Sequence, residues 1–251
     1  MRKQSRIYKN DISKEFVELF NSIGPYRSKG ELWSDFITMA ACAISNACDP
    51  KFFDIREEMY KRCAKNYSKE DLGKIADLLT LVVLAFEKCP AQDFLGEIFS
   101  LMNLNNARRG QFFTPYSIAS LMAYAALEHD DIIPNDRKLT ISDPACGAGC
   151  MFIACVQYFT QKRINYQQEV MFVGQDVDPL VAKMCYIQLS LLGCDAIIKI
   201  GNSLTDPILE NEPITENIWR TPMHMFGSIL KYGLCSSQKE AEEERIGEEP
   251  A

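Results

Sequence analysis

A glycine-rich turn between a predicted strand and a predicted helix is the segment of this sequence best suited to chemistry. Residues 142–150 read Ser-Asp-Pro-Ala-Cys-Gly-Ala-Gly-Cys, after an apolar run that ends at Ile141 and before a helical pattern that starts at Met151. Glycines let the backbone approach a ligand closely, and the first turn of a helix offers N–H groups that have no partner within the helix. Asp143, at the strand end, could accept hydrogen bonds from an amino group. The segment predicts a cradle for a small molecule, although a Gly-x-Gly pair alone also occurs for purely steric reasons.

Two more predicted strands end in polar residues that suit a nucleoside. The apolar run 170–173 leads to Gly-Gln-Asp-Val-Asp-Pro, and the run 196–200 leads to Gly-Asn-Ser-Leu. An acidic residue at the end of the second strand is the usual sugar anchor in doubly wound folds, which makes Asp176 the candidate. The alternative role of such an acid is to cap the following helix, and Asp178 fits that role better because Pro179 follows it.

The order and spacing of these segments resemble a known family. Upstream of the glycine turn stands Gly-Gln-Phe-Phe-Thr-Pro at residues 110–115. Together with the glycine turn, the acidic turn and the segment after the third strand, it resembles the S-adenosylmethionine half of the N6-adenine DNA methyltransferases, in particular the modification subunits of type I restriction systems. The resemblance covers roughly residues 92–207.

The resemblance implies a fold and a set of cofactor contacts. The fold would be α/β, a partial Rossmann-like S-adenosylmethionine-dependent methyltransferase fold behind an N-terminal helical domain. Asp143 would receive the ammonium group of the cofactor, Asp176 the ribose hydroxyls, and Asn202, where relatives commonly have aspartate, the adenine edge. The cofactor-binding residues expected in this way are Gln111, Phe112, Phe113, Thr114, Pro115, Asp143, Ala145, Gly147, Ala148, Gly149, Asp176 and Asn202. For Phe113 the alternative is a core aromatic residue.

The catalytic motif of the family is missing from this sequence. That motif is Asn/Asp-Pro-Pro-Tyr/Phe after a fourth strand, whereas none of the 11 prolines here is adjacent to another. The nearest match, Asn211-Glu212-Pro213-Ile214, lacks the first proline and the aromatic ring. The exocyclic amine of adenine is a poor nucleophile, and the motif both accepts its hydrogens and stacks on the flipped base. The sequence therefore predicts no catalytic residue in this chain.

Two functions from different classes remain open at this point. The first is an enzyme of the N6-adenine DNA methyltransferase family that is completed by a partner chain or by an unrecognised catalytic segment. The second is a catalytically silent S-adenosylmethionine-binding protein that regulates or decoys a restriction–modification system. A third alternative, methylation of RNA or a small molecule, rests on the shared cradle alone.

Composition limits the partners and the compartment. The net charge is −7, and residues 239–251 carry six glutamates against Lys239 and Arg245, which leaves −3 for the rest of the chain. A nearly neutral body lacks the basic surface of an autonomous DNA binder, so we expect weak DNA binding by the chain alone. The ten cysteines form no Cys-x-x-Cys pair and the two histidines are isolated, which predicts no metal site and free thiols in a reducing, cytoplasmic setting. No apolar run is long enough for a membrane span.

The predicted elements divide the chain into three parts. Helical patterns fill 1–106, and their simplest interpretation is a packed bundle without its own ligand. The part 107–232 alternates helix 117–128, strand 139–143, helix 149–160, strand 170–175, helix 179–192 and strand 196–200, which predicts a parallel sheet. The charged remainder, 233–251, is expected to be a disordered tail.

The strand 139–143 is expected to lie at an edge of this sheet. In the family the catalytic strand lies beside it, but no obvious fourth strand follows Leu204 in this sequence. Exposed edges are templates for pairing with other chains, so proteins cover them. We expect residues 215–232 to fold over this edge through Trp219, Met223, Phe226 and Ile229, with a restriction–modification partner or self-association over whatever stays exposed.

Overall fold

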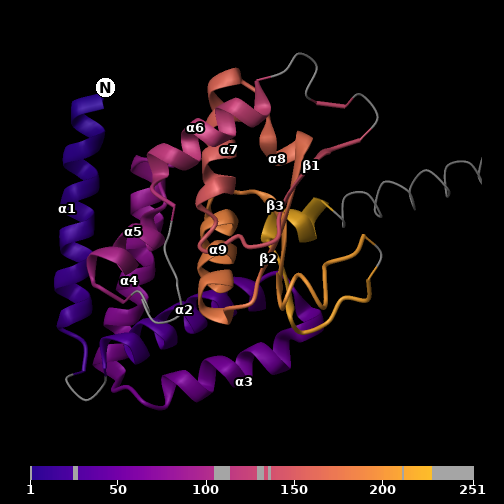
Figure 1. Cartoon of the computed structure of the whole chain (residues 1–251). Coiled ribbons are helices and arrows are strands. Elements are labelled where there is room, and N and C mark those ends of the chain that lie inside the picture. The colour runs from indigo at the N-terminus through magenta and orange to yellow at the C-terminus, as the bar shows by residue number, and fades with distance from the viewer. Residues whose placement is uncertain are drawn as a thin grey trace, which may run out of the picture.

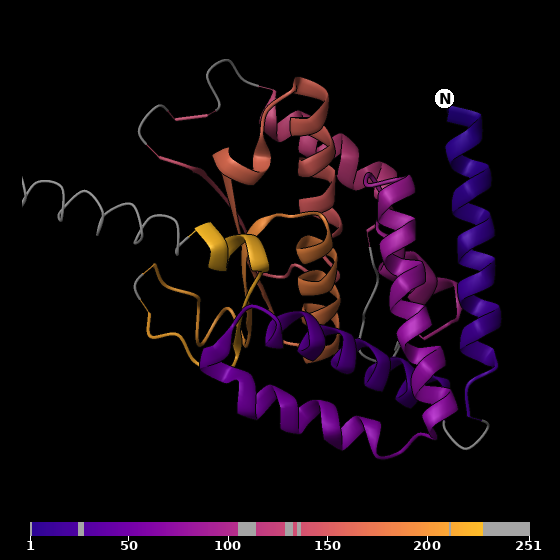
Figure 2. The ribbon, with the colours of Figure 1, turned by 180° about the vertical axis from the view of Figure 1, so that it is seen from behind.

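The computed structural model places a four-stranded sheet against a layer of helices (Figure 1). It describes residues 2–24, 28–104, 114–128, 133–134, 137–210 and 212–227, with side chains from residue 11 onward. Two helices, α7 and α9, lie along one face of the sheet, and the N-terminal helices pack outside them (Figures 1 and 2). One continuous apolar core runs through both layers.

The N-terminal part is helical, as the sequence predicts. Its elements are α1 (Arg2–Asn21), α2 (Lys29–Asn46), the 3₁₀ turn η1 (Pro50–Phe52), α3 (Phe53–Ala64), α4 (Lys69–Lys88) and α5 (Phe94–Leu101). Ser28 caps α2 in a capping box: its side chain accepts from the Glu31 N–H, and the Glu31 side chain accepts from the Ser28 N–H. Ser68 caps α4. Aromatic rings from α1, α2 and α5 pack around Trp33 and Phe16 with centroids 5.7–6.3 Å apart. Burial of these rings holds the helices together.

The second part alternates between helices and strands close to the predicted positions. Its elements are α6 (Tyr116–Leu127), β1 (Leu139–Asp143), α7 (Cys150–Lys162), α8 (Tyr166–Glu169), β2 (Val170–Asp176), α9 (Pro179–Leu191), β3 (Asp195–Ile200) and β4 (Ile218–Arg220). The strand order is β1-β2-β3-β4, and the first three strands are parallel. The predicted α/β fold is therefore confirmed.

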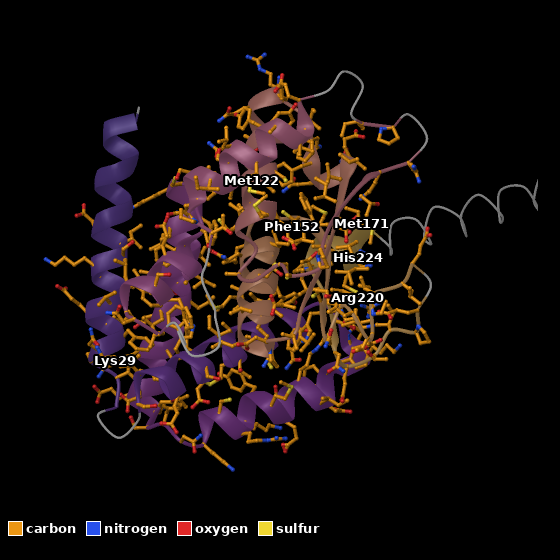
Figure 3. The ribbon with its side chains drawn as sticks, viewed as in Figure 1. Lys29, Met122, Phe152, Met171, Arg220 and His224 are labelled. Carbon is orange, nitrogen blue, oxygen red and sulfur yellow. The ribbon has the colours of Figure 1, made fainter. Side chains whose placement is uncertain are left out.

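Helices cover the two faces of the sheet unequally among the described residues. Val170, Phe172 and Ile198 are buried against α7 and α9, and Phe152 on α7 packs on Phe172 with ring centroids 5.5 Å apart (Figure 3). On the opposite face Met171 and Val173 are only half-buried. That face carries the loop after β3 and the short helix 222–227 in place of a helical layer.

The expectation for residues 215–232 is wrong. Residues 218–220 form a strand, β4, that pairs antiparallel with β3 and so lies at the edge opposite β1. The cause is the preceding loop, because the buried Lys199 on β3 binds Asp206 at 2.9 Å and Glu212 at 2.8 Å. These two ion pairs fold the loop back, so that residues 218–220 run beside β3. Trp219 then packs on Tyr186 of α9, with ring centroids 5.3 Å apart, instead of covering β1.

The β4 edge is closed by a buried arginine. Arg56 of α3 lies between the rings of Phe52 and Trp219, 5.0 and 4.4 Å from their centroids. Its guanidinium donates to the Ile218 carbonyl oxygen at 2.9 Å and to the Asp49 carboxylate at 3.1 Å. Asp49 also binds Arg220 at 2.8 Å. One charge network thus joins the N-terminal helices to the last strand.

Two further properties of the described residues are the state of their cysteines and the length and polarity of their helices. Nine cysteines, from Cys42 to Cys194, carry free thiols, and most of them are buried in the core. No helix in the part of the chain that the structure describes is both long and apolar enough to cross a membrane.

Candidate functional site

The glycine turn begins where β1 ends and is fastened to β2. The Cys146 N–H donates to the Gln175 carbonyl oxygen at 3.0 Å, and the Gly147 N–H donates to the Asp176 carboxylate at 2.9 Å. Gly147 and Gly149 have φ angles of +53° and +92°, in the left-handed region that only glycine adopts without strain. The turn therefore needs glycine at both of these positions.

Buried side chains of the core contact the glycine turn and fix its position. The Gln188 side chain of α9 donates to the Ala148 carbonyl oxygen at 2.8 Å and to Asp93 at 2.8 Å, and its oxygen accepts from the Leu95 N–H at 3.0 Å. A Cβ on Gly149 would meet the Cys185 sulfur at 2.8 Å. Gln188, Asp93 and Cys185 escaped the sequence analysis because they lie on elements distant in sequence. A polar glutamine within the apolar pattern of α9 was the only available signal.

The ends of β1, β2 and β3 bring three predicted residues to one side of the sheet. Asp143 lies opposite Gly174 in register, Asp176 lies opposite Ile200, and the Gly201 N–H donates to the Asp176 carbonyl oxygen at 2.9 Å. Parallel strands end at the same edge, which is where open α/β sheets bind ligands. Asp143, Asp176 and Asn202 thus gather beside the glycine turn.

Asp143 and Asp176 each accept hydrogen bonds from nearby backbone N–H groups. Asp143 accepts from the Ala145 N–H at 3.0 Å through one carboxylate oxygen. Asp176 accepts from Gly147 through one oxygen and from Asp178 at 2.9 Å through the other, which fixes its orientation. Burial raises the pKa of Asp176, while the two backbone N–H donors act to lower it. Each of its oxygens keeps lone-pair capacity for a further donor.

Asp178 has the capping role that the sequence favours for it. Its carboxylate accepts from the Leu180 N–H at 2.9 Å, and Pro179 occupies the first turn of α9. Asp178 is thus the helix cap, and Asp176 remains the acid that faces the strand ends.

Asn202 is exposed and is turned toward its own loop. Its side-chain oxygen accepts from the Leu204 N–H at 2.9 Å, which leaves the second lone pair of that oxygen and the amide NH₂ group to meet an adenine. Val177 and Leu204, which follow neighbouring strand ends, are 69% and 91% exposed. The sequence analysis missed these two apolar side chains, and the signal was an apolar residue directly after each polar strand end.

The upstream motif is described only in part. Gln111, Phe112 and Phe113 lie outside the described residues, as do Asn211 and the tail from residue 228. Thr114 and Pro115 are exposed at the start of α6, and the Thr114 carbonyl oxygen accepts from the Cys150 thiol at 3.4 Å. This contact places the end of the upstream motif beside the first residue of α7, next to the glycine turn.

The N-terminus of α7 completes the site. Its N-cap is Gly149, which has no side chain to cap the first turn. The N–H groups of that turn suit a carboxylate, an acid beside them suits an ammonium group, and a second acid suits vicinal hydroxyls. The donors and acceptors therefore fit a zwitterionic nucleoside. No cluster of metal-ligating side chains occurs within the described ranges.

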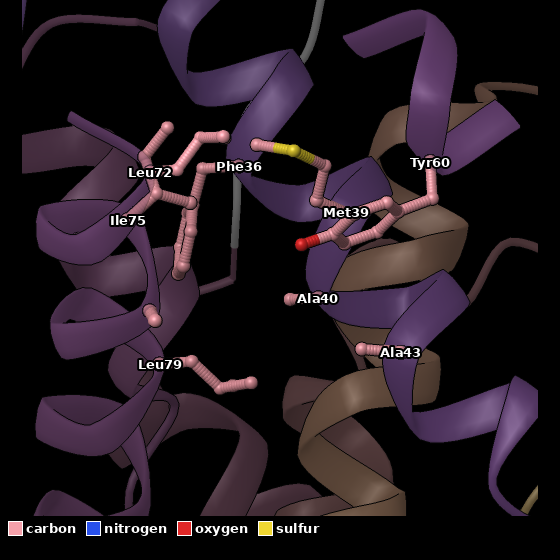
Figure 4. A pocket seen from close by; sticks show the side chains of 9 residues that line it. Phe36, Met39, Ala40, Ala43, Tyr60, Leu72, Ile75 and Leu79 are labelled. Carbon is pink, nitrogen blue, oxygen red and sulfur yellow. The ribbon is translucent and has the colours of Figure 1, made fainter. Parts of the chain in front are cut away.

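Two hollows elsewhere do not share this chemistry. One, of about 90 Å³, lies between α2, α3 and α4, and its only polar side-chain atom is the Tyr60 hydroxyl oxygen (Figure 4). Pockets for small molecules measure about 300–1,000 Å³, so this one is a packing gap. The other, of about 360 Å³, lies over the open face of the sheet between Thr140, Met171 and Leu209, away from the glycine turn.

Comparison with known proteins identifies the family. The model of the N-6 DNA methylase family matches residues 91–243, more than half of the chain, and this protein belongs to that family. The type I restriction enzyme MjaVIII methylase subunit of Methanocaldococcus jannaschii is 28% identical over 153 residues, which are 58% of this chain and 24% of that protein. The HindI methylase subunit of Haemophilus influenzae is 27% identical over 110 residues, 42% of this chain and 23% of that protein.

The match to these relatives is partial. The chain spans about a quarter of the length of the curated relatives it matches. A type I restriction–modification methyltransferase subunit from Streptococcus thermophilus superposes with a TM-score of 0.43 at 12% identity, over 83% of this chain and 61% of that one. The family predicted from the four motifs is confirmed, and S-adenosylmethionine is the cofactor to which this membership points.

Proposed function

We propose that this chain binds S-adenosylmethionine at the carboxyl ends of β1, β2 and β3, as the cofactor-binding part of an adenine-specific DNA modification system. The observation that carries the proposal is the meeting of Asp143, Asp176 and the uncapped N-terminus of α7 around one glycine turn. The cofactor carries a methyl group on a sulfonium. The residues of this chain bind and orient it.

Each part of the cofactor has a proposed contact. The carboxylate meets the first turn of α7, the ammonium group meets the second oxygen of Asp143, and the ribose hydroxyls donate to Asp176. Val177 and Leu204 form an apolar slot for the adenine ring, with Asn202 at its polar edge. The segment Gln111–Pro115 closes the methionine side.

The proposed partners are DNA and further subunits. The matched relatives are methylase subunits of type I restriction enzymes, which supports both partners for this chain. The sequence has no Asn/Asp-Pro-Pro-aromatic group, so the acceptors for the adenine amine have to come from another segment or subunit. The second candidate function, a silent cofactor-binding regulator or decoy of such a system, is favoured by the same missing motif.

Calorimetry with S-adenosylmethionine and S-adenosylhomocysteine tests cofactor binding. Asp176→Ala removes an acceptor of charge-assisted hydrogen bonds and is expected to weaken binding by about 10- to 100-fold, or roughly 1–3 kcal/mol. Asp178→Ala is the matched control, because this acid caps α9 and should leave the affinity within about threefold. No binding of either nucleoside at millimolar concentration would disprove the proposal.

A methyl-transfer assay separates the two candidate functions. Labelled S-adenosylmethionine and mixed duplex DNA should give no transfer with this chain alone. Transfer after addition of the other subunits of the system supports the modification role. Cofactor binding without transfer in the complete system supports the regulator or decoy.

A further inference from the structure

One buried glutamine joins the glycine turn to the start of a helix that is distant in sequence. Gln188 is fully buried on α9, which lies between the sheet and the N-terminal helices (Figures 1 and 2). Its side-chain NH₂ group donates to the Ala148 carbonyl oxygen and to the Asp93 carboxylate, both at 2.8 Å. Its side-chain oxygen accepts from the Leu95 N–H at 3.0 Å. A primary amide is the group that can serve two acceptors and a donor at once.

The start of α5 fixes the orientation of this amide. Asp93 is the N-cap of α5, and its buried carboxylate also accepts from the Gly96 N–H at 3.0 Å. The Leu95 N–H belongs to the first turn of α5 and has no acceptor within that helix. Turning the amide of Gln188 over would set its oxygen against the carboxylate and its NH₂ group against this N–H. The second amide hydrogen is therefore directed at the glycine turn.

The peptide group between Ala148 and Gly149 is the part of the turn that this hydrogen bond controls. Its carbonyl accepts from Gln188, and its N–H donates to the Cys146 carbonyl oxygen at 2.8 Å. Gly149 has a φ of +92°, but glycine populates positive and negative φ about equally. The glycine therefore permits this peptide plane to turn over, and Gln188 favours one orientation. Because Gly149 is also the N-cap of α7, that orientation sets where the first N–H groups of α7 point.

The nucleoside end of the cradle is held by a different glutamine. Gln175 of β2 is 2% exposed, and its side chain donates to the Asp206 carbonyl oxygen at 2.8 Å and accepts from the Ile208 N–H at 3.0 Å. These bonds hold the loop that carries Asn202 and Leu204. The side-chain hydrogen bonds of the two glutamines share no residue. The two ends of the cradle are therefore positioned by separate side chains.

From these contacts we propose that Gln188 is a positioning residue that makes the cradle prefer adenosine ligands with an amino-acid end over those without one. The ligand class is a nucleoside whose 5′ substituent carries both a carboxylate and an ammonium group. Gln188 acts through the Ala148 carbonyl oxygen, by presenting the first turn of α7 to that carboxylate. The inference rests on the proposed function, since it takes the cradle to be the site of S-adenosylmethionine.

Calorimetry of the full chain with two nucleosides tests the inference. S-adenosylhomocysteine has the amino-acid end, whereas methylthioadenosine has the same nucleoside and ends in a methyl group on the sulfur. Gln188→Met keeps the length of the side chain and removes its hydrogen bonds. It should raise the Kd of S-adenosylhomocysteine at least about fivefold and leave that of methylthioadenosine within about twofold. A general loss of folded protein does not change the ratio of the two Kd values, because it weakens both ligands by the same factor.

Gln175→Met is the matched control. It removes two hydrogen bonds from a similarly buried glutamine at the nucleoside end, so it should leave the ratio of the two Kd values within about twofold. If Gln188→Met does not fold, Gln188→Asn takes its place with the same expectation, because asparagine is one methylene too short to reach all three partners.

Three outcomes would overturn the inference. They are equal weakening of both ligands by the Gln188 variant, an equal change of the ratio by Gln175→Met, and an unsubstituted chain that binds S-adenosylhomocysteine but not methylthioadenosine at millimolar concentration. Binding of neither nucleoside by the unsubstituted chain would instead disprove the proposed function, and this inference with it.

Discussion

The two edges of the sheet, β1 and β4, differ in what contacts them. At the β4 edge, Arg56 is stacked between two aromatic rings and paired with Asp49, and it fixes the last strand to the N-terminal helices. At the β1 edge the face away from the helices presents the small polar residues Thr140 and Ser142, and α6 presents apolar side chains nearby. One edge is therefore completed within the chain by a buried charge network, and the outer side of the other has no strand paired with it among the described residues.

The cradle lies between these edges, where β1, β2 and β3 end, and its glycine turn follows directly from β1. Its glycine turn is held by β2 and by Gln188, while its ligand groups point from the strand ends. Substitutions in the glycine turn and at the β4 edge should therefore have separable effects on cofactor binding and on stability.

Arg56→Ala should be the most damaging substitution. It leaves the buried Asp49 with Arg220 as its remaining ion-pair partner among the described residues, and it removes the cation from two ring faces. Breaking a buried pair by removing one partner costs about 3–5 kcal/mol, which should appear in the free energy of unfolding from denaturant titration. Thr140→Lys at the open edge is the matched control and should change that free energy by less than about 0.5 kcal/mol. Equal losses at the two edges would contradict the comparison.

Gly149→Ala should have an intermediate effect that is confined to the cradle. The left-handed φ of +92° costs an alanine about 1–2 kcal/mol, and the contact with the Cys185 sulfur adds an overpacking cost of about 1–3 kcal/mol. The double variant Gly149→Ala/Cys185→Ala should therefore lose less stability than the two single changes added together. Gly30→Ala is the control, since a Cβ there meets nothing within 4 Å and its helical position favours alanine.

Asp195 should produce the smallest effect, and one that depends on pH. Its carboxylate, at the start of β3, binds Lys138 before β1 and His224 after β4. Burial acts to raise the pKa of Asp195, but the hydrogen bonds from His224 and Lys138 outweigh it, and the net shift is downward. A depressed pKa means that the stabilisation is present above about pH 3.9, the ordinary value, and is lost as the pH falls through the folded-state pKa.

The substitution Asp195→Asn should remove that pH-dependent stability. The expected loss at pH 7 is about 1–2 kcal/mol, from hydrogen bonds that the charged carboxylate accepts. Thermal unfolding of the two proteins should differ at pH 7 and converge in acid below the folded-state pKa of Asp195. A difference that persists unchanged in strong acid would show that the ion pairs do not cause the stability.

Much of the fold follows from local sequence. Strand 139–143 is observed at the predicted bounds, and strands 170–176 and 195–200 differ from their predicted ranges by one residue, because apolar runs followed by glycine or aspartate mark strand ends clearly. The glycine turn and the cap at Asp178 were also predictable, since both depend on backbone conformations that few residue types support. The partners of Gln188 were not, because they come from α5 and the glycine turn, far apart in sequence.

The sequence by itself determined the family, the glycine turn and the acids that meet at the strand ends, because each depends on residue types at short spacings. Only the tertiary structure decided how the sheet ends. The sequence allowed Trp219 to cover β1, but Lys199 clamps the preceding loop and Arg56 provides a stacking site, so residues 218–220 extend the other edge. The contribution of Arg56 depends on a contact with the Ile218 carbonyl oxygen, 162 positions away, which no local pattern encodes.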